Sequence, residues 1–375
     1  MKVTFPHMGN LYICVKGMLE YLGIEVTMPP KTSKRTLTLG SKYGPEFACM
    51  PLKLNLGNFI EASELGAETI MMAGGCGPCR FGYYAQVEHS ILQDLGYDYD
   101  IVVLEPPDKS ITELTSRVRQ ITGKKSWWKV IQSIRYGYLK SRAVDTVELL
   151  SFKTRPRELL TGETDRALNQ ALKEIDRAQT VEELKLAEAR GSEMMQDVAV
   201  DSNRRVIKIA LIGEIFTLLE PFANLNIERH LGRLGVEVDR SIYLSEWIND
   251  HLFMGLLKGI RSTKEYCRNA SPYLNHFVGG HGLETVGSVP VYAKQGYDGV
   301  IQLFPFTCMP EIVAESLLPK VSAAYNIPLM TLITDEHTGE AGMITRLEAF
   351  VDLLERKQYQ NYQGARSQEL EVRMS

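Results

Sequence analysis

Short apolar runs alternate along the chain with segments whose apolar residues recur every three or four positions. The first pattern is typical of buried strands and the second of amphipathic helices. In the first part of the chain, strands are predicted at 3–5, 24–28, 68–73 and 101–104, and helices at 11–22, 51–65 and 81–95. This alternation indicates an α/β domain with a mostly parallel sheet.

The pattern returns near residue 206. Strands are predicted at 206–212, 236–242, 299–303 and 328–333, and helices at 222–234, 245–267, 311–325 and 341–356. Leu-Gly-Ile-Glu-Val at 22–26 matches Leu-Gly-Val-Glu-Val at 234–238. We therefore expect two related α/β domains at 1–105 and 206–357, with a chance resemblance of two βαβ stretches as the alternative.

Residues 106–205 lack a strand signal and predict a mostly helical insertion, whereas the polar stretch 358–375 predicts a disordered tail. Within the insertion, 109–157 holds twelve Lys or Arg against three Asp or Glu, with Trp127 and Trp128 in the middle. The simplest interpretation is a solvated helical face. The alternative is a docking surface for an acidic partner or for the phosphates of a cofactor such as coenzyme A.

Composition narrows the classes of function. Of 375 residues, 44% are hydrophobic and 23% are charged, and the formal net charge is −4. These values are typical of a globular protein and exclude a disordered or fibrous one. A chain with this charge is not an electrostatic nucleic-acid binder. Because no apolar run approaches the roughly 18 residues of a membrane span, we expect a cytoplasmic protein without a membrane partner.

The cysteines carry most of the chemical signal. Cys76-Gly77-Pro78-Cys79 follows a predicted strand and two glycines and precedes a helix. Ligand sites of open α/β sheets lie at this edge, where the strands end. Such a C-x-x-C pair is compatible with a thioredoxin-type redox pair, a metal site or an iron–sulfur site.

Two further cysteines help to decide between these three kinds of site. Cys49 and Cys308 each begin a Cys-Met-Pro tripeptide just before a predicted helix. Because proline favours the first helical position, each thiol is expected beside the positive end of a helix. We expect all four thiols to meet in the cleft between the two domains.

Four thiolates suit a 4Fe–4S cluster or zinc. Structural zinc usually takes two close C-x-x-C pairs, so the cluster is favoured, with zinc or four unlinked core thiols as alternatives. Cys14 and Cys267 are expected to be buried apolar residues.

Other polar residues lie near the predicted strand ends. The segment 335–342 contains Glu336, His337 and Glu340, and Glu214 follows the first strand of the second domain. These side chains could hydrogen-bond a cluster ligand or a substrate, although an acidic helix start is equally compatible with 335–342. Lys53 is expected either to pair with a charged cluster or to face solvent.

These motifs together resemble the 2-hydroxyacyl-CoA dehydratase superfamily. The chain is most similar to the branch of acyl-CoA dehydratase activase-related proteins, also described as CoA-substrate-specific enzyme activase-related. The resemblance covers most of 1–357. It is carried by Gly-Gly-Cys-Gly-Pro-Cys-Arg-Phe-Gly-Tyr-Tyr at 74–84, both Cys-Met-Pro sites, Leu-Ile-Gly-Glu-Ile at 211–215, the 335–342 stretch and Thr-Arg-Leu-Glu-Ala-Phe at 345–350.

The resemblance implies two Rossmann-like domains holding a cluster between them, an anaerobic setting, and electrons delivered by an ATP-dependent activase. The leading hypothesis is an electron-transfer or reductase component. The alternatives are an (R)-2-hydroxyacyl-CoA dehydratase component that binds a CoA thioester, and a non-catalytic cluster scaffold. A homodimer is one candidate assembly, and the sequence does not determine the oligomeric state. A double-cubane cluster would have to recruit Cys14 and Cys267. The chain contains no P-loop, so the activase's own ATPase activity is not expected.

Overall fold

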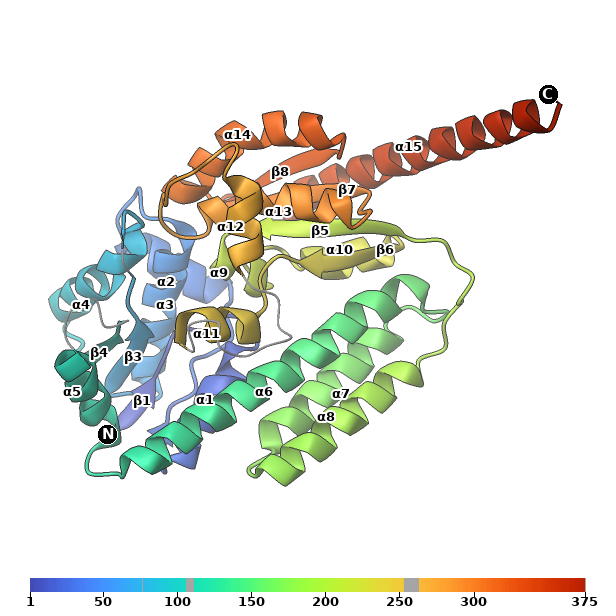
Figure 1. Cartoon of the computed structure of the whole chain (residues 1–375). Helices are drawn as coiled ribbons and strands as arrows, with labels where there is room; N and C mark the ends of the chain where they lie inside the picture. Colours follow the sequence, from blue (N-terminus) through green and yellow to red (C-terminus); the bar gives the residue numbers. More distant parts are fainter. Residues whose placement is uncertain (76, 106–110, 253–262, 375) are drawn as a thin grey trace.

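The protein contains two four-stranded parallel sheets flanked by helices, and a long helical hairpin lies beside them (Figure 1). This computed structural model describes residues 1–374 apart from residue 76 and the segments 106–110 and 253–262. The expected α/β class with two parallel-sheet units is confirmed. Among the described residues, no helix is both long enough and apolar enough to cross a membrane.

The first unit begins at the N-terminus. Its sheet has the order β2-β1-β3-β4, with every pair of neighbouring strands parallel. The elements are β1 (Lys2–Thr4), α1 (Leu11–Tyr21), β2 (Glu25–Val26), α2 (Lys34–Tyr43), α3 (Met50–Glu64), β3 (Thr69–Ala73), the 3-10 helix η1 (Arg80–Tyr83), α4 (Tyr84–Asp94) and β4 (Asp100–Leu104).

The second unit repeats this plan, with the order β6-β5-β7-β8 and parallel pairing throughout. Its elements are β5 (Ile207–Gly213), α9 (Ile215–Leu219), α10 (Ile227–Arg233), β6 (Val236–Arg240), α11 (Leu244–Leu252), α12 (Thr263–Ala270), α13 (Gly282–Lys294), β7 (Gly299–Pro305), α14 (Met309–Tyr325), β8 (Leu329–Thr334) and α15 (Glu340–Met374). The equal strand order makes the elements of the two units correspond one to one.

The central strands of the second unit are buried on both faces. Ile209 and Leu211 of β5 face one core, whereas Ala210 and Ile212 face the other. Burying one such large aliphatic side chain contributes roughly 1.5–3 kcal/mol. The unit is therefore held by two cores, one on each side of its sheet, as expected for strands covered by helices on both faces.

Close packing between neighbouring helices fixes the positions of the helix starts that border the candidate site. In the first unit, a Cβ at Gly57 of α3 would lie 2.0 Å from the Thr36 carbonyl oxygen of α2. In the second unit, a Cβ at Gly287 of α13 would lie 1.8 Å from the Tyr266 carbonyl oxygen of α12. Only glycine permits this backbone-to-backbone approach. Both units therefore fix the helix that precedes their third strand, α3 and α13, in the same way.

The insertion joins the two units rather than standing apart. It consists of α5 (Ile111–Thr122), α6 (Trp127–Thr154), the 3-10 helix η2 (Arg155–Arg157), α7 (Glu163–Arg177) and α8 (Val181–Gln196). Glu148 of α6 accepts a hydrogen bond from Asn10 of the first unit at 2.7 Å and pairs with Arg240 of the second. Asp145, one turn earlier, accepts from the Ser245 amide at 2.8 Å.

Several basic residues of 109–157 have structural partners. Lys140 is buried and donates to the Asp176 carbonyl at 2.8 Å. Arg155 is buried against Asp165, and Arg117 pairs with Glu105 and Glu113. Others remain exposed, including Lys124 and Lys129 beside Trp128, so the basic run divides into a packed part and a solvated part.

Three differences from the sequence analysis concern helices. Helices α2, α9 and α13 lie where no element was expected. Helix α15 continues to Met374 and projects away from the second sheet (Figure 1), whereas a disordered tail was expected from 358. Much of the helix expected at 245–267 falls outside the described residues, between the end of α11 and the start of α12.

Candidate cysteine site between the two sheets

The described cysteines of the predicted site all lie at helix starts. Cys49 is the residue before α3, Cys79 the residue before η1, and Cys308 the residue before α14. Proline occupies the first turn of α3 and of α14, where its missing N–H leaves no helical hydrogen bond unmade. The fourth predicted ligand, Cys76, lies outside the described residues.

The three thiols converge from both units. Cys49 lies close enough to Cys79 and to Cys308 for the charge of one thiol to affect the pKa of the other, although 259 positions separate Cys49 from Cys308. Burial is the main cause that raises the pKa of all three thiols. A thiol that is costly to ionise in isolation becomes a good ligand when a bound cation balances the thiolate.

Each thiol accepts or shares one hydrogen bond. The Sγ atom of Cys49 and the Oη atom of Tyr84 are 2.5 Å apart. The Phe81 amide donates to Cys79 and the Glu311 amide donates to Cys308, and both contacts lower the pKa of the sulfur that accepts. Hydrogen bonds of this kind to sulfur are expected around thiolate ligands, where they stabilise the negative charge.

Arg80 ties the two cysteine loops together. Its guanidinium donates to the Phe47 carbonyl at 2.8 Å, two residues before Cys49, and to Thr307 Oγ1 at 2.8 Å, beside Cys308. Thr307 has a φ of 67°, which is strained for a β-branched residue. The positive charge of Arg80 also lowers the pKa of Cys49 and Cys79.

A loop of the second unit packs on the C-x-x-C turn of the first. A Cβ at Gly279 would lie 2.8 Å from the Cys79 amide nitrogen, and a Cβ at Gly280 would lie 4.0 Å from the Cys79 Sγ atom. A Cβ at Gly77 would meet the Phe277 ring at 2.7 Å. The sequence analysis missed this loop. The consecutive glycines before a helix were the signal that it contained.

Two carboxylates lie near the thiols. Glu214 was predicted, and its charge raises the pKa of Cys49, Cys79 and Cys308. Its own oxygens accept hydrogen bonds from the first amides of α9. Glu311 was not predicted. Burial raises its pKa to about 8, while Thr285 and Gln302 hydrogen-bond to it.

The remaining candidates separate into two groups. Lys53 is buried and pairs with Glu336 at 2.6 Å, so these two predicted residues meet each other across the two units. Burial raises the pKa of Glu336, but the hydrogen bond from Lys53, the backbone hydrogen bond of Glu336 and the charge of Lys53 together outweigh it, so the pKa is lowered overall. His337 is exposed, and Glu340 lies 3.3 Å from His230 on α10, so the contacts of both are local to the second unit.

Cys14 and Cys267, which belong to none of the cysteine motifs, lie away from the candidate site. Cys14 is buried in α1 next to Lys140 and Asp145 of α6, as expected for a core thiol. Cys267 is half-buried in α12, where burial and then the charge of Glu284 raise its pKa to about 11. Neither has Cys49, Cys79 or Cys308 among the groups that shift its pKa.

The side chains at the site can be compared with the ligands that a metal ion or a metal cluster requires. Within the described residues, no three or more His, Cys, Asp or Glu side chains are grouped so as to hold a metal ion, and Cys76 is not one of these residues. The chemistry of the described thiols fits an iron–sulfur cluster. Cys49 and Cys308 are buried and Cys79 is half-buried, they come from both units, each has a hydrogen-bonding partner at its sulfur, and the guanidinium of Arg80 lies beside them.

Comparisons with known proteins assign no family to the chain. No protein-family model matches the chain, and no curated protein matches it. The assignment of function therefore depends on the residues themselves.

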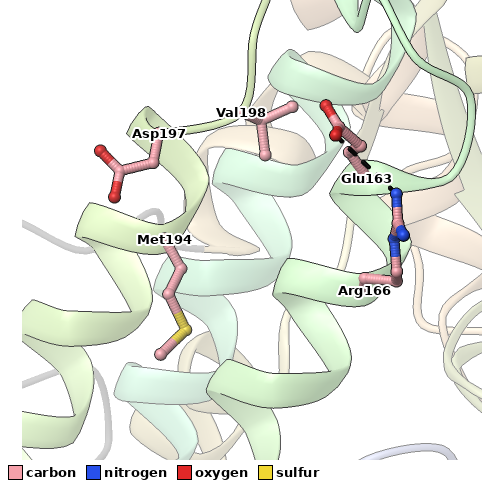
Figure 2. Close-up of a pocket in the computed structure, with 5 residues that line it drawn as sticks. All are labelled: Glu163, Arg166, Met194, Asp197 and Val198. Atoms are coloured by element: carbon pink, nitrogen blue, oxygen red, sulfur yellow. Dashed lines mark ion pairs between the residues drawn. The ribbon is translucent and has the colours of Figure 1, made fainter.

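The pocket shown in Figure 2 lies in the helical insertion, away from the candidate cysteine site. It has a volume of about 260 Å³ and lies between the start of α7 and the end of α8. Its lining includes the Glu163–Arg166 ion pair and Asp197, whose side chain stands on the opposite wall. None of the candidate site residues lines it.

Proposed function

We propose that this chain is an iron–sulfur protein in which Cys49, Cys76, Cys79 and Cys308 hold a 4Fe–4S cluster between the two α/β units. It works as an electron-transfer or reductase component that receives electrons from an ATP-dependent activase or a similar donor. The resemblance to the 2-hydroxyacyl-CoA dehydratase superfamily supports this proposal.

One observation carries it. Arg80, next to Cys79, joins the Cys49 and Cys308 segments of the two units through Phe47 and Thr307, and each of these three thiols has a hydrogen-bonding partner at its sulfur. Unlinked core thiols have no reason to share this arrangement, because a buried cysteine in a core behaves as a small apolar residue. A redox disulfide would use two cysteines and leave the others unexplained.

When bound, such a cluster accepts and releases single electrons. The amides of Phe81 and Glu311 and the hydroxyl of Tyr84 would stabilise the negative charge on the ligand sulfurs. Arg80 adds one positive charge and fixes the spacing of the two loops. Lys53 holds α3 against the segment after β8 through Glu336.

The surface beside the cysteines suits a protein donor. Phe47, Tyr83 and Phe306 belong to the cysteine-bearing segments and are 75%, 72% and 57% exposed. Exposed aromatic side chains are enriched at protein interfaces, where they contribute much of the binding energy. This aromatic rim, formed by Phe47, Tyr83 and Phe306, supports docking of the electron donor at the cluster. A cluster reduced in this way belongs in a reducing compartment, which agrees with the expected cytoplasmic location.

The proposal is tested by redox cycling of the anaerobically purified protein. We expect reversible one-electron reduction, driven either by dithionite or by activase with ATP, and loss of this signal in Cys79→Ser. Turnover of a 2-hydroxyacyl-CoA in the same mixture would instead assign a dehydratase component that binds the CoA thioester. A bound cluster without reversible reduction would contradict the proposal and leave a scaffold role.

A further inference from the structure

Helix α13 of the second unit corresponds to α3 of the first. Each precedes the third strand of its unit, β7 or β3, and these strands occupy the same place in the strand order. Each packs through a glycine on the backbone of the preceding helix. Each is followed by a glycine with positive φ, 81° at Gly66 and 77° at Gly296. The residue before α3 is Cys49, and the residue before α13 is His281.

The backbone around His281 lies at the cysteine site. On one side, a Cβ at Gly280 would lie 4.0 Å from Cys79 Sγ and 3.2 Å from Pro310 Cγ. On the other side, a Cβ at Gly282 would lie 2.5 Å from the Pro310 carbonyl oxygen. His281 therefore stands between the C-x-x-C turn of the first unit and the helix that Cys308 begins, and it is half-buried there.

We propose that His281 is the second unit's counterpart of Cys49 in the site. Its imidazole faces the bound cluster and donates an N–H to a cluster or ligand sulfur, which sets the reduction potential. The inference depends on the proposed cluster. Four cysteines already supply four ligands, so the histidine acts beside them as a positioning residue rather than as a fifth ligand. Hydrogen bonds to sulfur stabilise the reduced, more negative state and therefore raise the potential.

The chain offers matched variants for a test. His281→Ser removes the imidazole but keeps a side chain that can cap α13, and His281→Asn keeps both a cap and an N–H donor. His276→Ala is the control, because His276 lies five residues upstream, is exposed, and has its Nδ1 atom 3.3 Å from Oδ1 of the adjacent Asn275. Circular dichroism confirms that each variant is folded.

The measurements are iron per chain, the midpoint potential, and pulsed EPR of the reduced protein with ¹⁵N-labelled histidine. We expect wild type and His276→Ala to agree in all three. His281→Ser should show a more negative potential and lose the histidine nitrogen coupling, with His281→Asn between them. If folded His281→Ser retains no iron, the potential and the nitrogen coupling of His281→Asn decide.

An unchanged potential together with an unchanged nitrogen coupling in His281→Ser would overturn the inference. This failure is distinct from failure of the proposed function, which would appear as a wild-type protein without iron. If His281→Ser does not fold, His281→Asn decides, because an Asn side chain cannot reproduce the coupling of a labelled imidazole.

Discussion

Arg80 shows how a single side chain connects the two halves of the site. Cysteines, prolines and glycines stand out in a sequence, so Cys49, Cys79 and Cys308 could be predicted as residues at helix starts. Arg80 also lies in the C-x-x-C segment, but its contacts with Phe47 and Thr307 span 33 and 227 positions. Sequence spacing does not encode such distant partners. The same reason explains why Glu311, buried against Thr285 and Gln302, was not predicted.

Replacing Arg80 by lysine should weaken the site while keeping the charge. Lysine cannot reach both loops with a rigid fork, so hydrogen bonds to Phe47 or Thr307 are lost. We expect a loss of about 1–3 kcal/mol in the free energy of unfolding and less iron retained per chain. Urea unfolding and iron analysis measure these effects. Arg35→Lys, an exposed arginine paired with Glu64, should leave both values unchanged. Equal behaviour of the two variants would refute the bracing role of Arg80.

At the scale of elements, the strands and the repeated plan could be predicted, but the helices α2, α9 and α13 could not. Helix α13 contains two glycines, four valines or threonines and Pro290, which are poor helix formers, yet most of its residues are buried. Tertiary packing against α12 and α14 stabilises it instead. Helix α2 is short and mostly polar, so few apolar residues mark it in the sequence. The pattern of apolar residues therefore did not predict α13, the helix that His281 precedes.

Gly57 tests the close packing of α2 and α3. An added methyl group at this position would lie 2.0 Å from the Thr36 carbonyl oxygen, so the helices must separate. We expect Gly57→Ala to cost about 1–3 kcal/mol in the free energy of unfolding. Gly342→Ala is the control, because nothing lies within 4 Å of a Cβ there and alanine favours helix α15. Urea unfolding of both variants checks this. A Gly57→Ala protein as stable as wild type would contradict the packing.

Asp145 links the stability of the α6–α11 contact to pH. Burial is the main cause that raises its pKa to about 7, and neighbouring Glu148 adds to the rise. A carboxyl that is neutral in the folded state but ionises near pH 4 when unfolded loses its stabilising contribution as pH rises from about 4 to about 7. The wild type should therefore lose more stability than Asp145→Asn over this range.

We expect Asp145→Asn to be more stable than wild type at pH 8 by on the order of a few kcal/mol, and to lose this advantage near pH 4. Urea unfolding at several pH values measures the difference. The exposed Asp197→Asn is the control and should follow the wild type. Parallel pH curves for wild type and Asp145→Asn would show that Asp145 is ionised when folded.

For the whole molecule, the sequence indicated that two sheets would place their strand ends together, because cysteines followed corresponding strands in both units. It did not indicate what holds the units in place. The structure shows Arg80, the Lys53–Glu336 pair, and α6, whose Glu148 contacts Asn10 and Arg240. These contacts join residues from distant parts of the chain. They depend on the folded arrangement rather than on any local motif.

The aromatic rim gives a prediction about the partner. Phe47→Ser combined with Phe306→Ser should slow reduction by activase and ATP at least tenfold, because an interface anchor is worth about 1.4 kcal/mol or more. Reduction by dithionite, which needs no docking, should keep its wild-type rate. Leu186→Ser, an exposed apolar residue on α8, is the control for nonspecific effects. Equal activase rates for all three proteins would exclude docking at the rim.

The most direct test of the central claim is the content of iron and acid-labile sulfide in the anaerobically purified chain, with an EPR spectrum after dithionite reduction. The account predicts about four iron and four sulfide per chain and a reduced-cluster signal. Both should be lost in Cys308→Ala and in Cys76→Ala. About eight iron would indicate a double cubane that recruits Cys14 and Cys267. Zinc in place of iron, or a protein that binds no metal, would contradict the account.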